Sequence, residues 1–89
     1  MPALVAYDVS REQSAVKSEM QKLGYQDYIP ASNGTTYHLP DTTLFHHTFD
    51  IQRATQDIQA VTRSLGIVLV RQIAVPCGEF NGIAGVPRH

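Results

Sequence analysis

The chain has 89 residues, of which 43% are hydrophobic and 17% are charged. This length supports one domain, and domains so small bury only about 60% of the surface that their unfolded chain exposes, so a partner subunit would add stability. The 7 Lys and Arg residues against 8 Asp and Glu residues argue against strong non-specific binding to nucleic acids, which needs many cations facing phosphates. We therefore expect a single domain that forms a homodimer.

The cysteine content and the first residues indicate where the protein resides. Cys77 is the only cysteine, so an internal disulfide is excluded and a reducing, cytoplasmic location is expected. The first residues include no basic segment, and their apolar run ends at Asp8. That run is typical neither of a signal peptide nor of a membrane span, so no membrane partner is expected.

The first predicted elements are a strand and a helix. Leu4–Tyr7 is continuously apolar, which is typical of a central strand buried on both faces. Ser10 and Gln13 have the spacing of a capping box, which predicts that a helix begins there and runs over Arg11–Leu23. Gly24 can then end this helix in the left-handed conformation.

Two further strands are predicted in the middle of the chain. Tyr25–Ile29 is the first, and Asn33-Gly34 after it is a turn signal. Thr43–His47 is the second, because β-branched and aromatic residues suit a pleated surface.

The second helix has the clearest pattern in the chain. Apolar residues recur at helical spacing over Ile51–Leu65, with Thr48 or Asp50 as its cap and Gly66 at its end. Ile67–Val75 follows as the most strand-like run.

This order of elements predicts an α+β domain over residues 1–76. The expected fold is ferredoxin-like, βαββαβ, with a four-stranded antiparallel sheet and two helices on one face. The other face of the sheet is then either polar or covered by a second subunit. The tail, residues 77–89, is a mobile end or an arm that packs on a partner, and we expect it and the last strand to lie nearest to that partner.

Two short segments resemble a known family. Ala3–Ser10 is a hydrophobic run that ends in a Tyr-Asp pair, as in the first strand of the Cas-two family of CRISPR-associated adaptation proteins. Leu39–Leu44, with the sequence Leu-Pro-Asp-Thr-Thr-Leu, is similar to a stretch before the third strand of SinR-like relatives of that family. The resemblance spans about residues 3 to 75.

The resemblance implies a symmetric dimer of ferredoxin-like subunits whose strand-end aspartates face each other. Some members of the family are metal-dependent nucleases, and others are platforms for a DNA-integrating partner. This chain departs from the family because Arg11 is the only cation between the Tyr-Asp pair and Lys17, which weakens the case for a long nucleic-acid substrate.

Asp8 is the candidate catalytic residue and metal ligand. A carboxylate just beyond a central strand can hold Mg²⁺, and two such carboxylates related by symmetry could bind one ion that activates a water for attack on phosphate. The family resemblance supplies most of the support for this role. The alternative is an aspartate that bonds to backbone N–H groups in a turn.

The other candidate groups receive less support from the sequence. His46 and His47 are neighbours on a predicted strand, so they should point to opposite faces and not share one metal. A metal site built from His38, His46 or His89 has no accompanying cluster of carboxylates or cysteines at ligand spacing. Cys77 lacks the neighbours of a nucleophile. No glycine loop opens a helix, so no organic cofactor is expected.

Two functions remain open from the sequence. The first is a Cas-two-like dimer with a role that involves nucleic acid, such as a weak Mg²⁺-dependent endonuclease acting on RNA or DNA through Asp8. The second is a non-catalytic dimeric module, SinR-like or of the toxin–antitoxin type, for interaction or regulation. The Tyr7-Asp8 ending favours the first, and the near-neutral charge favours the second. The first is the working hypothesis because it names residues that can be tested.

Overall fold

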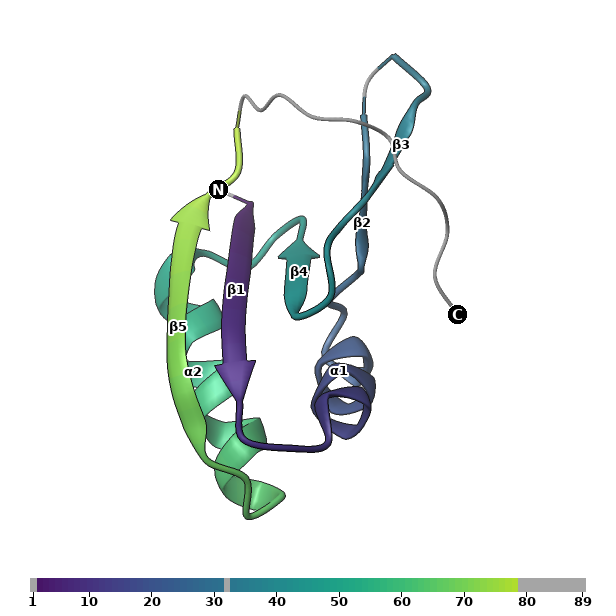
Figure 1. The fold of residues 1–89 in the computed structure, drawn as a ribbon. Coiled ribbons are helices and arrows are strands. Elements are labelled where there is room, and N and C mark those ends of the chain that lie inside the picture. Colours follow the sequence, from purple (N-terminus) through teal and green to yellow (C-terminus); the bar gives the residue numbers. More distant parts are fainter. Residues whose placement is uncertain (1, 32, 79–89) are drawn as a thin grey trace.

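The computed structural model describes residues 2–31 and 33–78 (Figure 1). In chain order the elements are β1 (Ala3–Val9), α1 (Gln13–Lys22), β2 (Tyr28–Pro30), β3 (Thr36–His38), β4 (Thr43–His46), α2 (Ile51–Ser64) and β5 (Leu69–Pro76). Each predicted strand and helix has a counterpart in this order, but β3 is an additional strand that was not predicted, so the predicted order of four strands and two helices is only partly confirmed. The tail after residue 78, including His89, lies outside the described residues.

The strands form two antiparallel sheets. One has the order β4-β1-β5, and the other is the hairpin of β2 and β3. Figure 1 shows β5 at the outer edge of the three-stranded sheet, with α2 behind it. The described part of the chain is thus a small α+β fold with two helices and antiparallel sheets of three and two strands.

The predicted strand over Tyr25–Ile29 meets the three-stranded sheet at one bridge only. There, Gln26 and Phe45 exchange two backbone hydrogen bonds of 2.8 Å. The backbone N–H of Leu39 then donates to the carbonyl of Asp27 at 2.8 Å, which draws the following residues into the hairpin. β2 begins at Tyr28 for this reason, so the predicted bounds are wrong.

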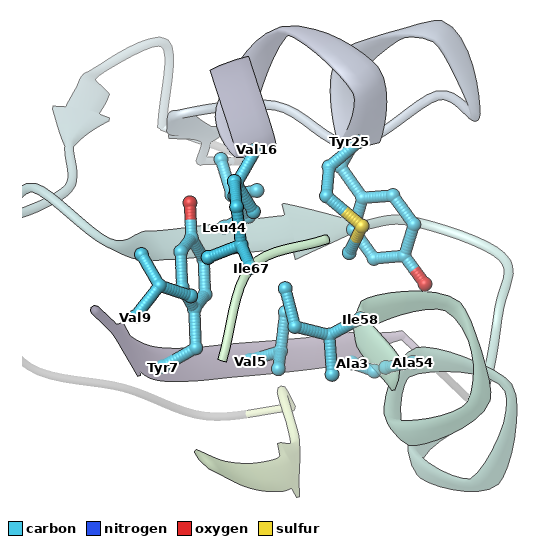
Figure 2. Close-up of a cluster of buried hydrophobic side chains, with 11 residues drawn as sticks. Ala3, Val5, Tyr7, Val9, Val16, Tyr25, Leu44, Ala54, Ile58 and Ile67 are labelled. Atoms are coloured by element: carbon cyan, nitrogen blue, oxygen red, sulfur yellow. The ribbon is translucent and has the colours of Figure 1, made fainter. Parts of the chain in front are cut away.

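The hydrophobic core lies on one face of β1. Figure 2 shows Val5, Tyr7 and Val9 on the same side of β1, facing the helices. α1 adds Val16 and α2 adds Ile58 to this core, and both side chains are completely buried. Both helices therefore supply side chains to a single core.

The prediction that β1 is buried on both faces is wrong. Buried and half-buried residues alternate along this strand, with Leu4 and Ala6 on the half-buried side. Alternation of this kind is typical of an antiparallel sheet that is covered on one face only.

The start of α1 differs from its prediction. The helix begins after Glu12, which has a left-handed φ of 53° and makes no side-chain capping bond. Ser10 bonds instead to the segment before β5: its backbone N–H donates to the Val68 carbonyl at 3.0 Å, and its hydroxyl accepts from the Val68 N–H at 3.3 Å. The predicted capping box is therefore wrong, because a contact distant in sequence has taken the hydroxyl.

The prediction for α2 is confirmed. The Asp50 carboxylate accepts a hydrogen bond of 2.9 Å from the Arg53 N–H, which caps the helix. Gly66 follows the helix with a φ of 68°, a conformation that glycine adopts without strain. β5 then starts at Leu69, two residues later than the predicted strand.

No helix within residues 2–31 and 33–78 is long and apolar enough to cross a membrane.

Candidate functional site

Asp8 lies near the end of β1, directly opposite Arg71 of β5. The Nη2 and Nε atoms of Arg71 lie 2.8 and 2.9 Å from the same carboxylate oxygen, Oδ2 of Asp8. The side chain of Asp8 remains 42% exposed and that of Arg71 remains 79% exposed. They therefore form a cross-strand ion pair on the face of the sheet that is turned away from the helices.

This ion pair changes what Asp8 can do chemically. A metal ion at Asp8 would have to share or displace the guanidinium of Arg71, because both are attracted to the same carboxylate. Among residues 2–31 and 33–78, no group of three or more His, Cys, Asp or Glu side chains is placed to hold a metal ion. One copy of the described chain thus offers Mg²⁺ a single, already paired carboxylate at this position.

The surroundings of the ion pair are shallow and partly apolar. A hollow of about 320 Å³ lies beside it and is bordered by Ala6, Asp8, Arg71 and Ile73. The pairing of β1 with β5 is irregular between Asp8 and Val9, and Val70 is the extra residue on β5. Such bulges bend and twist an edge strand.

The open face next to Asp8 carries exposed apolar side chains. Of the six large hydrophobic residues that are exposed in the described part of the chain, four lie between Val68 and Val75. Ile73 is 63% exposed, and the register places it opposite Ala6 of β1. Towards β4 this face is closed, because Phe45 is buried there.

His46 is buried, and its ring nitrogens are both engaged. Nε2 lies 3.1 Å from the Leu23 carbonyl, so it must carry the proton, while Nδ1 accepts from the backbone N–H groups of Thr48 and Phe49 at 3.2 and 3.0 Å. Burial lowers the pKa of this imidazole. His46 thus joins the end of α1 to the start of α2 in its neutral form.

The prediction that His46 and His47 point to opposite faces is wrong. Their rings stack with planes 8° apart and centroids 5.6 Å apart. β4 ends at His46, so the strict alternation of a strand no longer applies at the next residue.

A buried acid beside His46 was not predicted from the sequence. Asp57 accepts a hydrogen bond of 2.8 Å from the Tyr25 hydroxyl and two bonds, of 3.0 and 3.2 Å, from Arg53 Nε. Burial and the bond to Asp57 raise the pKa of Tyr25. The spacing of four between Arg53 and Asp57 is the one sequence signal that indicates this pair.

The remaining predicted groups are separated in the fold. His38 lies on β3 with its ring tilted against Tyr28, at a centroid distance of 6.4 Å. Cys77 follows β5 and bonds through its backbone N–H to the Pro2 carbonyl at 2.8 Å. Burial raises the pKa of the Cys77 thiol, which makes the nucleophilic thiolate scarcer at neutral pH.

Comparison of the chain with family models, with curated proteins and with solved structures finds no match. Any function proposed for this chain therefore rests on the contacts of Asp8, the open face around Ile73 and the groups described above.

Proposed function

We propose that this chain is a dimeric interaction module that binds a second copy of itself through the open face of β1 and β5. The observation that carries the proposal is the group of exposed apolar side chains on and just before β5, with Ile73 at 63% exposure. A contiguous exposed apolar patch is typical of a protein interaction site. Here the exposed apolar side chains lie on and next to β5, an edge strand whose only neighbour in the described sheet is β1.

The charges on this face favour a second copy as the partner. A two-fold axis brings a patch against itself, so the patch has to be self-complementary. Asp8 and Arg71 form a pair of opposite charges within one copy, and the same two residues on another copy can meet them with opposite signs. The rest of the face is apolar or neutral, with Leu4 opposite Val75 in the register.

The position of β5 supports the same partner. It has eight residues and lies at the end of the three-stranded sheet. An edge strand of this length carries unpaired N–H and C=O groups that bind readily to another strand. Pairing of a second copy along this edge would satisfy these groups and would add to the packing of that copy on the open face.

We further propose that the fold is ferredoxin-like and that the chain is related to the Cas-two-like and SinR-like proteins. The Gln26–Phe45 bridge occupies the place that the fourth strand of a ferredoxin-like sheet would take beside β4, which supports that topology. The Tyr7-Asp8 ending and the Leu39–Leu44 segment support kinship with Cas-two-like and SinR-like proteins. The single cysteine supports a cytoplasmic location.

Sedimentation equilibrium tests the proposed dimer. At a chain concentration of about 10 μM we expect a species of twice 9.8 kDa. Modest interfaces commonly have dissociation constants in this micromolar range. Ile73→Asp places a charge on the open face and should give the single copy. Ile51→Asp is the matched control, since Ile51 is exposed at the start of α2 and an acidic residue is tolerated there. A wild-type protein that stays at 9.8 kDa rules out the dimer.

A metal-dependent nuclease is the second candidate function. It is favoured by one observation, the exposed carboxylate of Asp8 near the end of a central strand. In a two-fold dimer, two such carboxylates close together would repel each other unless a cation lay between them. The proposed partners are then Mg²⁺ and an RNA or DNA strand.

Two variants separate the roles of Asp8. Asp8→Asn keeps the shape of the side chain and should abolish any cleavage that depends on Mg²⁺ or Mn²⁺, while the dimer persists. Arg71→Gln releases the carboxylate and should increase cleavage, because the guanidinium no longer competes with the metal. Equal cleavage by the wild type and Asp8→Asn would show that Asp8 has no role in the mechanism. If neither protein cleaves RNA or DNA, the nuclease is ruled out and only the interaction module remains.

A further inference from the structure

The open face of β1 and β5 carries its charges at one end and apolar side chains along the rest. Alternate residues of both strands share this face, and the register joins them as Asp8 with Arg71, Ala6 with Ile73, and Leu4 with Val75. The first of these cross-strand pairs is an ion pair, and the other two are apolar. A second copy that covers this face therefore has to match a charged end and an apolar end at once.

The ion pair within one copy uses only one oxygen of the carboxylate. Nη2 and Nε of Arg71 lie 2.8 and 2.9 Å from Oδ2 of Asp8. The fork that arginine frequently forms with a carboxylate engages both oxygens, so Oδ1 of Asp8 and Nη1 of Arg71 take no part in this pair. A guanidinium has more N–H donors, and a carboxylate more lone pairs, than these contacts use. Each residue can thus hold its neighbour and a second ion of opposite charge.

A two-fold axis that runs across the strands does not suit these charges. Such an axis lays β1 over the partner's β1 and β5 over the partner's β5. Placed level with Asp8, it brings Asp8 against the partner's Asp8 and Arg71 against the partner's Arg71, and like charges in contact oppose association. Placed level with Ile73, it lays Arg71 on the partner's Val75, which removes water from a charge without supplying a new partner.

A two-fold axis that runs along the strands, midway between β1 and β5, satisfies both ends of the face. It lays β1 over the partner's β5, so each residue meets the copy of its own cross-strand neighbour. Asp8 then meets the partner's Arg71, and Leu4 meets the partner's Val75. Two sheets commonly pack face to face with their strands within about 30° of each other, and this alignment keeps both contacts within reach.

We propose that, in the dimer on which this inference rests, the two-fold axis runs along β1 and β5 and Asp8 of each copy forms a second ion pair with Arg71 of the other copy. These exchanged ion pairs make the face specific for its own kind, because a partner without the same pattern leaves both charged residues unmatched. They also separate this dimer from the nuclease candidate, which needs the axis across the strands and two facing Asp8 carboxylates.

Charge reversal in separate chains tests the exchanged ion pairs. Asp8→Arg alone and Arg71→Asp alone should each weaken self-association about tenfold, because like charges then face each other between the copies. An equal mixture of the two variants should form a mixed dimer with about the wild-type affinity, since every contact between the copies again joins opposite charges. Repulsion within one copy is present in all of these species, so it cannot favour the mixed dimer. Sedimentation equilibrium measures the affinities.

Glu19 and Lys22 provide the matched control. They form an exposed ion pair of 2.6 Å on α1, which packs on the opposite face of the sheet. Glu19→Arg and Lys22→Asp shift the net charge as Asp8→Arg and Arg71→Asp do. Their mixture should associate as each of them does alone, which separates a contact between copies from an effect of net charge.

Contacts in the wild type give a second measurement that does not depend on the folding of the variants. In a mixture of labelled and unlabelled chains, isotope-filtered nuclear Overhauser spectra should join Leu4 of one copy to Val75 of the other. Two results would overturn the exchanged ion pairs while the proposed dimer stands. One is a mixture of folded Asp8→Arg and Arg71→Asp that associates no more tightly than either variant alone, and the other is contact between Val75 of one copy and Arg71 of the other. A wild type that stays a single copy would reject the proposed dimer itself.

Discussion

The two faces of β1 differ although they belong to the same seven-residue strand. Val5 and Tyr7 point to the helices and are buried, whereas Leu4 and Ala6 point away and are only half-buried. On β5, Ile73 of the open face is exposed, while Ala74 next to it packs against the core. Apolar character alone therefore does not decide whether a residue of this sheet is buried; the difference is whether another part of the chain covers it.

Replacement of isoleucine by aspartate should destabilise the fold far more in the core, at Ile58 of α2, than on the open face, at Ile73 of β5. Ile58→Asp places a charge where the side chain is completely buried, and it should cost about 3 to 5 kcal/mol or unfold the domain. Urea denaturation followed by circular dichroism measures this cost. An unchanged unfolding midpoint would mean that this face of α2 is not buried.

Much of this contrast could be predicted from the sequence, and the rest depends on contacts distant in sequence. The spacing of apolar residues in α2 and the run of β5 located both elements. The half-burial of Leu4 could not be read from its apolar run, because cover comes from other elements. The bond of Ser10 to Val68 and the ion pair of Asp8 with Arg71 join residues about sixty positions apart, so local capping and turn rules missed both.

Acid should lower the stability of the fold through His46, which is buried on the side of the sheet that the helices cover. The folded pKa of His46 is lowered by burial, so below its unfolded value of about 6.5 the unfolded chain binds more protons and stability falls as the pH drops. Protonation of Nδ1 would also break its bonds to the N–H groups of Thr48 and Phe49. We expect a falling unfolding midpoint between about pH 7 and pH 5.

Two variants identify the source of this acid sensitivity. His46→Gln should be less stable than the wild type at pH 7.5 and should show a flatter pH profile. His38→Gln, on the hairpin strand β3, is the control and should keep the wild-type profile. A wild-type profile in His46→Gln would assign the sensitivity to another group.

Removal of the cap at the start of α2 should lower the unfolding free energy by a smaller amount. Asp50→Ala removes the carboxylate that accepts from the Arg53 N–H at 2.9 Å. The expected loss is about 1 kcal/mol, the usual cost of removing such a cap. Thermal unfolding measures it, and Asp50→Asn, which keeps an accepting oxygen, should recover most of the loss. Equal destabilisation by both variants would argue against a cap.

The open face should give the smallest effect on folding. Ile73→Asp changes a residue that is 63% exposed, so the unfolding free energy of the single copy should change by no more than about 0.5 kcal/mol. The comparison with Ile58→Asp is made by urea denaturation at a concentration where Ile73→Asp sediments as one copy. A loss above about 2 kcal/mol in that single copy would place Ile73 in the fold's own core.

Contact between copies through the open face is tested most directly by isotope-filtered nuclear Overhauser spectroscopy on a mixture of labelled and unlabelled chains. We predict contacts between the two chains from the methyl groups of Leu4, Ile73 and Val75, and their loss in Ile73→Asp but not in Ile51→Asp. A spectrum without such contacts at a concentration of about 0.5 mM, where even weak dimers form, would contradict the proposal. Contacts that arise only from the outer surface of α2 would contradict it equally.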